Sequence, residues 1–197
     1  MSGVLGGVRV LDFGRFIAGP FAATILGDLG ADVIRIERLD GGEDRWTTPV
    51  TSDGQGALFL QVGRNKRSVT LNPMKEKGRK IMNSLVRSAD IVVANLPPET
   101  RKQMGLDYQS LKSVREDIIV SSVTCFGSGG SFSDRVGFDG LAQAMSGAMH
   151  MTGPEGQPTR NSTPYVDFCT GSLLAMATLA ALRHRDLTGE GQELEGA

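Results

Sequence analysis

Short apolar runs alternate with longer segments of helical spacing along most of the chain. Val8-Arg9-Val10-Leu11 is β-branched and lies between Gly7 and Gly14, which is typical of a buried strand. Residues 16–29 carry apolar positions at helical spacing, with Pro20 in a first turn and Gly30 where a helix ends. Residues 32–38 form a second strand pattern. This strand, helix and strand, joined by a short crossover, predict parallel pairing.

The same alternation continues to the end of the chain. Residues 68–71, 91–95 and 118–125 have strand patterns, and the last is the longest β-branched run. Helices are expected at 73–88, 99–104, 107–114, 138–149 and 165–185, and a polar, glycine-rich loop at 38–56. In the first of these helices Ile81, Leu85 and Val86 should face inward. The helix at 165–185 is apolar over most of its girth and should be buried on several sides.

Turn chemistry supports two of the short helices. Gly105 is placed to end the helix at 99–104, and Asp107 to cap the next one. The whole pattern predicts an α/β fold with an open, mostly parallel, Rossmann-like sheet and helices on both faces. A length of 197 residues fits one domain.

Composition and charge exclude several classes of protein. The chain has 21 Lys+Arg against 22 Asp+Glu, whereas a nucleic-acid binder usually shows a basic excess. The apolar runs are shorter than the ~20 residues that a membrane span needs. The first residues lack the basic and apolar regions of a signal peptide, so a cytoplasmic location is expected. The two cysteines, Cys125 and Cys169, predict neither a disulfide framework nor a metal site.

Ligands of open α/β sheets bind at the carboxyl ends of the strands, which draws attention to loops 12–19, 37–42, 95–98 and 125–130. The first loop contains Gly14 and Gly19 but not G-x-G-x-x-G, so a nicotinamide-dependent oxidoreductase is disfavoured. The chain also has no Walker phosphate loop and no G-x-S-x-G nucleophile elbow.

Basic residues gather near several predicted strand ends. Residues 63–68 carry three cations, and a solvated charge run is the better interpretation of that triplet alone. The alternative is phosphate binding, which uses cations with several donors. With Arg35, Arg38, Arg101 and Lys102 also near strand ends, a neutral chain of this kind favours one phosphorylated small ligand over a polyanion.

Two aspartates open the last two predicted helices. By pattern alone, Asp139 and Asp167 are best interpreted as capping or first-turn acids. A helix start also stabilises a carboxylate, which would keep Asp167 ionised and available as a nucleophile. The histidines His150 and His184 are expected at the surface, and packing is the expected role of both cysteines.

Several motifs together resemble the family III CoA-transferases, a group that includes formyl-CoA transferase, carnitine CoA-transferase and succinate–hydroxymethylglutarate CoA-transferase, with alpha-methylacyl-CoA racemase as a relative. The matching stretches occur in the family's order and are residues 7–12 with Ala18-Gly19-Pro20, residues 26–38, Asn65-Lys66-Arg67-Ser68, residues 137–147 and Thr188-Gly189-Glu190-Gly191-Gln192. Each motif is weak alone, but the set is specific.

The resemblance implies a CoA thioester as substrate, no permanently bound cofactor, and a small carboxylic acid as acceptor. It places the family's nucleophile on Asp167, which would form a mixed anhydride and then an aspartyl-CoA thioester. The residues that would line the CoA path are Arg15, Ile17, Arg38, Leu71, Asn95, Met104 and Phe126. Arg101 and Lys102 would serve the phosphates, and the loop from Gly127 to Gly130 would bring backbone donors to the thioester.

Three positions depart from the family pattern. Racemase relatives have a catalytic histidine where this chain has Phe138, which disfavours a racemase. Ile17 stands where formyl-CoA transferase has glutamine, and Gln103 where an arginine contacts the phosphates. The acyl group is therefore left open.

Family members are much longer than this chain. Residues 1–197 match the N-terminal portion of the CoA-binding large domain, and the family's small second domain has no counterpart. A homodimer or a complementary chain is expected, as in the interlocked family dimers. The alternative function is a half-subunit CoA-binding module that is inactive alone or needs its complement.

Overall fold

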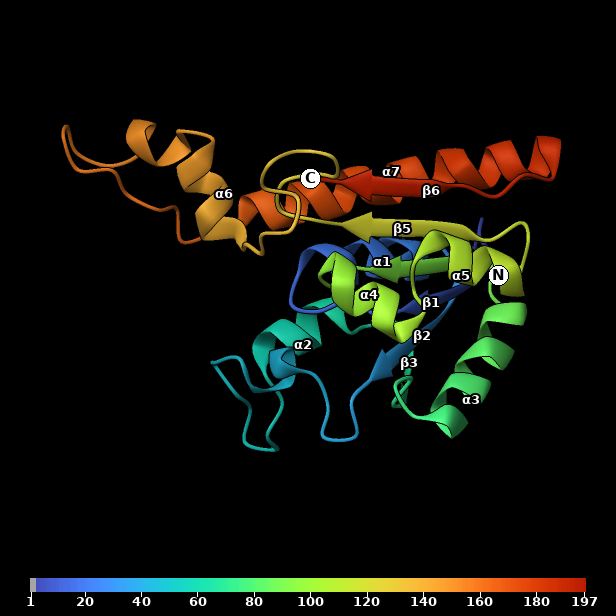
Figure 1. Cartoon of the computed structure of the whole chain (residues 1–197). Helices are drawn as coiled ribbons and strands as arrows, with labels where there is room; N and C mark the ends of the chain where they lie inside the picture. The colour runs from blue at the N-terminus through green and yellow to red at the C-terminus, as the bar shows by residue number, and fades with distance from the viewer. Residues whose placement is uncertain (1–2) are drawn as a thin grey trace.

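A twisted sheet of six parallel strands forms the centre of the computed structural model, which describes residues 3–197 (Figure 1). The strand order is β3-β2-β1-β4-β5-β6. The strands are β1 Arg9–Asp12, β2 Asp32–Glu37, β3 Lys66–Thr70, β4 Ile91–Ala94, β5 Ile119–Val123 and β6 Glu193–Gly196. This is the order of a doubly wound nucleotide-binding sheet, in which ligands bind where the order reverses, between β1 and β4. The predicted α/β class is confirmed, and every pair of strands is parallel.

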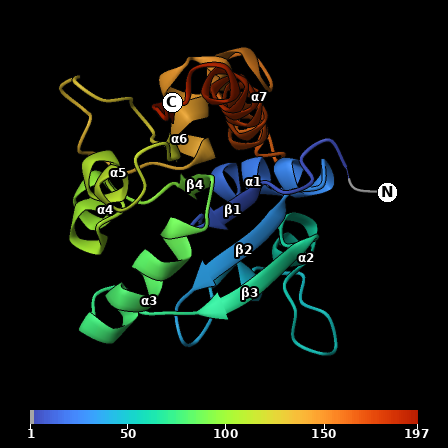
Figure 2. The same ribbon diagram turned by 90° about the vertical axis from the view of Figure 1, so that its right-hand side faces the viewer.

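Alternate strand residues face two separate hydrophobic clusters. Leu11 and Ile34 pack with α3 and α5, whereas Val10 and Val33 pack with α1 and α7. These helices are α1 Ala18–Asp28, α3 Glu76–Arg87, α5 Tyr108–Val114 and α7 Tyr165–Thr188, and α4 Pro98–Met104 precedes α5. Figure 2 shows α3, α4 and α5 on one side of the sheet and α1 and α2 on the other. Helices therefore cover both faces, as the apolar strands predict.

The longest helix, α7, packs along α1 and beside β5 and β6. Its contact with α1 is close, because a Cβ on Gly171 would lie 2.7 Å from the carbonyl oxygen of Ala18. The expected burial on several sides is wrong, because Leu173 and Met176 are 63% and 64% exposed. Helix α7 is long enough and apolar enough to cross a membrane, judged by length and composition alone. The sequence expectation of no membrane span rests on a different criterion, which is the short length of the uninterrupted apolar runs. Alanines between the larger apolar residues add to the mean hydropathy of α7.

The segment before α7 projects from the body of the molecule (Figure 1). It contains α6 Asp139–Met145 and a short 3₁₀ helix, η2 Ala148–Met151. A single helix over 138–149 is expected from the sequence, but the chain turns at Gly147, whose φ is 78°. Glycine adopts this left-handed conformation without strain, so the two helices are separate.

Other elements differ from the sequence expectation. The loop 38–56 contains a 3₁₀ helix, η1 Glu43–Trp46, and is followed by α2 Ala57–Val62, which the periodicity does not reveal. Ile81 is 51% exposed, although its spacing predicts that it faces inward. The strand β6 is not expected from its residues, because its acidic positions make it half polar and it lies at the sheet edge. By contrast, the Asp107 cap is confirmed by a 3.0 Å hydrogen bond from the Ser110 amide.

Candidate active site

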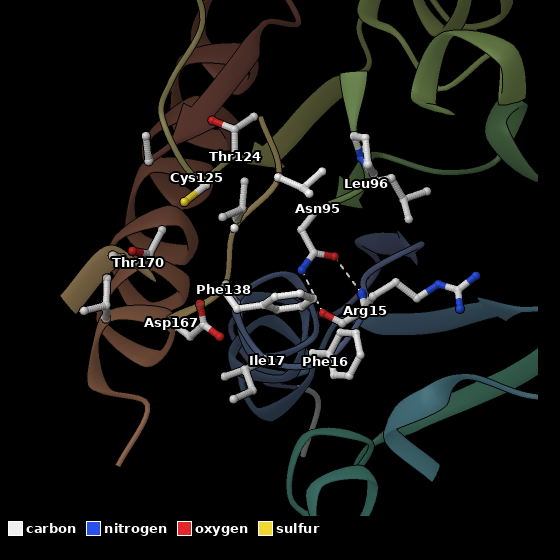
Figure 3. Close-up of a pocket in the computed structure, with 18 of the residues that line it drawn as sticks. Arg15, Phe16, Ile17, Asn95, Leu96, Thr124, Cys125, Phe138, Asp167 and Thr170 are labelled. Atoms are coloured by element: carbon white, nitrogen blue, oxygen red, sulfur yellow. Dashed lines mark hydrogen bonds between the residues drawn. The ribbon is translucent and has the colours of Figure 1, made fainter. Parts of the chain in front are cut away.

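A cavity of about 240 Å³ opens at the carboxyl ends of β1, β4 and β5 (Figure 3). Its lining comes from the loop after β1, the Asn95–Pro98 turn, the end of β5, residues 133–138 and the first turn of α7. Arg15, Ile17, Asn95 and Asp167, which are all predicted site residues, line this cavity together. The cavity therefore lies where the sequence analysis expects a ligand, at the carboxyl ends of the strands.

The Asp167 carboxyl group faces the cavity from the first turn of α7 (Figure 3). Burial, together with the nearby Asp139 carboxylate, raises the pKa of Asp167 to about 6. The helix-dipole argument predicts the opposite direction, and it is wrong here because desolvation and a like charge prevail. At pH 7 roughly nine-tenths of such a group is still ionised. Among residues 3–197, no donor lies within hydrogen-bonding distance of the Asp167 carboxyl group.

Asp139, the first residue of α6, caps α7 from outside that helix. Its Oδ1 accepts hydrogen bonds from the backbone amides of Val166 at 2.8 Å and Asp167 at 3.3 Å. Asp167 itself does not cap the helix, since the N-cap residue is Pro164. The sequence leaves the roles of the two helix-opening aspartates open. In the structure Asp139 caps α7, and Asp167 faces the cavity.

The loop after β1 is held by side chains of neighbouring strands. The amide of Asn95 donates to the Arg15 carbonyl oxygen at 2.7 Å and accepts from the Arg15 amide at 2.6 Å. Phe16 has a φ of 56°, which is uncommon for a large side chain. Its ring meets the edge of the Phe138 ring, with the centroids 5.2 Å apart. This clamp presents Phe16 and Ile17 to the cavity.

Two cations lie next to this loop. Arg15 contacts one carboxylate oxygen of Glu43 at 2.6 Å, and Arg38 contacts the other at 3.1 Å. Arg38 does not line the cavity itself, but Glu43 ties it to Arg15, which does. Arg38 also pairs with Asp40 at 3.3 Å, so the two cations at the carboxyl ends of β1 and β2 lie among two acids.

The remaining predicted residues lie around the cavity rather than in its wall. Leu71 and Met104 belong to the hydrophobic cluster under the sheet. Phe126 packs edge-on against Phe132, with 5.5 Å between centroids. Arg101 is largely buried, 3.8 Å from Glu193, and Lys102 is exposed. The structure thus divides the predicted set into a cavity group and a surrounding group.

The glycine loop after β5 is anchored by the last strand. Thr124 Oγ1 and the Ser128 amide each donate to Glu195 at 3.0 Å, and these bonds help to lower the pKa of Glu195. The Gly127 amide donates to Thr124 Oγ1 at 3.0 Å, and Gly127 has a φ of 70°. A side chain would strain that turn, so the glycine is required there.

The cations of the basic triplet, Arg64 before β3 and Lys66 and Arg67 within it, are paired with acids. Lys66 begins β3, and its ammonium contacts the buried Asp12 carboxylate at 2.7 Å. Arg64 pairs with Asp28 at 2.6 Å, and Arg67 with Asp32 at 2.8 Å. None of the three lines the cavity. This pairing disfavours the alternative in which the triplet binds phosphates.

Arg35 is also unavailable to a ligand. It is 2% exposed, and its guanidinium pairs with Asp44 at 2.7 Å. Glu37, at the end of β2, accepts two hydrogen bonds from Arg45 and one from Ser68. In sheets that bind nicotinamide cofactors, an acid at this position binds the ribose. Both carboxylate oxygens of Glu37 instead accept hydrogen bonds from the protein itself. This geometry disfavours the oxidoreductase alternative further.

Sequence reasoning missed several residues of the cavity wall. Phe16, Thr124, Cys125, Arg135 and Thr170 line it. Packing is the expected role of Cys125; burial and the Asp167 charge raise the pKa of its thiol, so it is a poor nucleophile. The position of Cys125 as the last residue of the longest predicted strand is the signal that the sequence offers. No group of three potential metal-ligating side chains is found within the part of the chain that the structure describes.

Comparison with known proteins identifies the family of this chain. The sequence pattern of CoA-transferase family III matches residues 5–197. The chain belongs to CoA-transferase family III. The resemblance predicted from the separate motifs is thus confirmed, and the family match covers the cavity, α7 and the last strand.

Relatives within the family have names that specify CoA-transferases of small acids. The chain is 42% identical over 190 residues to succinyl-CoA:glutarate CoA-transferase of Mus musculus, covering 95% of this chain and 43% of that protein. It is 39% identical over 197 residues to the beta subunit of succinyl-CoA–L-malate CoA-transferase of Chloroflexus aurantiacus, covering 98% and 48% respectively. The chain therefore spans about half the length of these relatives.

A solved structure shows the same fold. A CAIB/BAIF family protein from Brucella suis superposes with a TM-score of 0.93 at 36% identity, covering 98% of this chain and 53% of that one. Again the chain compared is about twice as long.

Proposed function

We propose that this chain carries the CoA-binding loops and the nucleophile of an enzyme that transfers CoA from an acyl-CoA to a small carboxylic acid. The observation that supports this most is the Asp167 carboxyl group. It faces a cavity at the switch point of the sheet and has no hydrogen-bond donor on it within residues 3–197. A carboxylate without donors keeps its lone pairs free for attack.

The reaction would proceed through covalent intermediates on Asp167. A carboxylate oxygen attacks the thioester carbonyl carbon, the carbon–sulfur bond breaks, and CoA leaves as its thiolate. The thiolate then attacks the aspartyl carbonyl of the mixed anhydride, which releases the donor acid and leaves an aspartyl-CoA thioester.

The second half repeats these steps with the acceptor. The acceptor carboxylate attacks the aspartyl-CoA carbonyl and expels the thiolate. The thiolate then attacks the acceptor's carbonyl in the new anhydride, so the acceptor leaves as its CoA thioester and Asp167 is regenerated. Each step exchanges one acyl bond for another, so neither an oxidant nor a metal is needed for the balance.

The surrounding residues fit the parts of an acyl-CoA. Ile17, Phe16 and Phe138 give the cavity an apolar wall for the thioester arm. Arg15 and Arg38 present cations near its edge, where phosphates gain from donors in a fixed fork. The Gly127–Gly130 loop follows β5; its Gly127 and Ser128 amides are bonded within the protein, so within the described chain the Gly129 and Gly130 amides are the ones left to face a developing oxyanion.

The relatives' names favour a dicarboxylic acyl group for this chain as well, so succinyl-CoA is the first donor to test. Racemase activity is disfavoured, because Phe138 supplies no acid or base at the cavity. The second candidate is a CoA-binding half that needs a further chain or a second copy, and the coverage of about half of each relative favours it.

Intact-protein mass spectrometry after incubation with succinyl-CoA tests the proposal. A covalent CoA adduct should form on the unmodified chain, and glutarate or malate should discharge it. Asp167→Asn should form none, whereas Asp186→Asn, on the exposed end of α7, should behave like the unmodified chain. Equal labelling of the unmodified chain and the Asp167→Asn variant would refute the assignment. CoA binding without any adduct would instead support the binding-half candidate.

A further inference from the structure

The carboxylate of Asp139 is buried directly behind the first turn of α7. Asp139 is 7% exposed, and its Oδ1 receives the amides of Val166 and Asp167. Helix α7 begins at Tyr165 after Pro164, which makes no side-chain cap. The free amides of this turn are therefore satisfied by a residue from another helix, because unpaired buried amides would be costly.

Gln143 connects the same carboxylate to the chain that enters α7. Its Nε2 donates to Asp139 Oδ2 at 2.5 Å, and its Oε1 accepts from the Asn161 amide at 2.9 Å. Gln143 is 1% exposed, so this link is shielded from water. Both oxygens of Asp139 and both ends of the Gln143 amide are used, which fixes the backbone at Asp167 and in the segment that leads into it.

The cap itself uses only Oδ1 of Asp139, while Oδ2 accepts from Gln143 Nε2. Asparagine and serine cap helices about as well as aspartate does. A second buried carboxylate beside Asp167 opposes ionisation of Asp167, and this is visible as the raised pKa of Asp167. The carboxylate of Asp139 therefore holds both the first turn of α7 and Gln143, and it places a negative charge beside Asp167.

We propose that Asp139 is the positioning residue of Asp167: it fixes the first turn of α7 so that the Asp167 carboxylate faces the cavity, and its negative charge strengthens that carboxylate as a nucleophile. This inference rests on the proposed function only where it calls Asp167 a nucleophile. Its geometry and its effect on Asp167 can be tested without turnover.

Other charged or titratable groups also face this cavity and must be considered. They are Cys125, Arg15 and Arg135. The thiol of Cys125 stays neutral while Asp167 titrates, because burial raises the pKa of the thiol further. The two arginines are the same in every variant compared, so they do not contribute to the difference between variants. Asp139 is therefore the nearby group whose replacement isolates the like-charge effect.

Carbon-13 NMR titration of the Asp167 carboxyl group in the full 197-residue chain provides the test. In Asp139→Asn the cap oxygen remains, while the charge and the acceptor for Gln143 Nε2 are lost. We expect the apparent pKa of Asp167 to fall measurably, by up to about one unit, from the value near 6, because burial remains the larger cause of the shift. The matched control is Asp107→Asn, since Asp107 caps α5 in the same way but away from the cavity. It should leave Asp167 unchanged.

An unchanged Asp167 titration in a folded Asp139→Asn protein would overturn the proposal. If that variant does not fold, Asp139→Ser supplies a smaller neutral cap for the same comparison. In the unmodified chain, the Val166 and Asp167 amides should also exchange slowly with solvent, and rapid exchange of both would contradict the cap independently of any variant.

Adduct formation separates this inference from the proposed function. Asp139→Asn should lower the rate of labelling by succinyl-CoA several-fold with little change in the half-saturating concentration, and Asp139→Glu should restore part of the rate. If no adduct forms on the unmodified chain while the Asp167 pKa still depends on Asp139, the proposed function fails and the positioning contact stands. If adducts form at equal rates with and without the Asp139 charge, only the positioning proposal fails.

Discussion

Glu37 and Asp167 are both acids at the carboxyl end of the sheet, yet their surroundings shift them in opposite directions. Glu37 is enclosed by donors and cations, and although burial opposes the shift, hydrogen bonds from Arg45 and Ser68 and the charge of Arg35 lower its pKa to about 2. Asp167 is half-buried beside a second carboxylate, with no donor among residues 3–197, and its pKa rises to about 6. The difference lies in the partners: the paired acid holds a loop in place, and the other acid faces the cavity with no donor on its oxygens among residues 3–197.

The pairing of Glu37 also explains how the polar segment 38–56 is ordered. Arg45 binds both oxygens of Glu37 and lies over the Phe59 ring, 3.8 Å from its centroid. The amide of Gly42 adds a third donor at 3.0 Å. This cluster attaches η1 and α2 to the end of β2, and within the described residues no comparable cluster constrains the Asp167 carboxyl group.

The largest expected effect comes from replacing the reactive acid. Asp167→Asn should reduce CoA transfer by about a thousandfold or more, since the amide oxygen is a poor nucleophile. Its thermal stability should remain equal or rise, because a buried charge is removed. Transfer assays and melting curves, measured side by side, check both statements. A variant that keeps most of its activity would contradict the proposed role.

Replacing the paired acid should have the reverse profile. Glu37→Gln leaves Arg35 and Arg45 without their buried partner, and loss of one member of such a pair costs about 3 kcal/mol of unfolding free energy. Urea unfolding of this variant measures the loss. Glu76→Gln, in an exposed pair with Lys80, is the matched control and should change stability by less than about 0.5 kcal/mol.

The two acids should give opposite pH dependences of stability. The contribution of Glu37 is present above its unfolded pKa near 4.5 and is lost as the pH falls through about 2. The contribution of Asp167 is fully present below its unfolded value near 3.8 and is lost as the pH rises through about 6. Urea unfolding across the range from acid to neutral pH should show the upper step, and Asp167→Asn should remove it.

The pH dependence of activity sharpens the same contrast. Adduct formation needs the ionised Asp167, so its rate should rise with pH through about 6 and level off above it. A rate that stays flat on both sides of that value would show that the Asp167 carboxylate is not the attacking group.

A smaller effect is expected from the clamp on the loop after β1. Asn95→Ala removes two hydrogen bonds to the Arg15 backbone and should cost about 2 kcal/mol of stability. It should also weaken CoA binding, because Phe16 and Ile17 lose their fixed position. Calorimetric CoA titration and urea unfolding measure these changes. Asn83→Ala, on α3 away from the cavity, should alter neither, and a loss equal to that of Asn95→Ala would argue against the clamp.

Some features of the fold follow directly from local sequence. Runs such as Ile91-Val92-Val93-Ala94 can be satisfied only in a strand buried on both faces, so the parallel sheet is predictable. Gly105 and Asp107 mark helix ends by their own chemistry. The periodicity does not reveal the η1–α2 segment, because side-chain contacts of Arg45 with Glu37 and Phe59 stabilise it rather than an apolar repeat of its own.

The candidate site divides in the same way. Asp167, Arg15, Ile17 and Asn95 are predictable, since each follows a strand or opens a helix and the family motifs include them. The basic triplet at 64–67 stays open between a solvated run and phosphate binding, because a sequence shows charge but not the acids that neutralise it. The sequence also could not distinguish which of two helix-opening aspartates caps and which faces the cavity.

By itself the sequence determined the strand and helix order, the family, and the loops at which chemistry was to be sought, because these depend on local periodicity and on motifs. Tertiary structure alone decided that Asp139 caps α7, that Asp167 has a raised pKa, and that Lys66 and Arg35 are neutralised. The physical reason is that hydrogen bonding, burial and charge pairing depend on distances between residues far apart in the chain, which only the packed fold specifies.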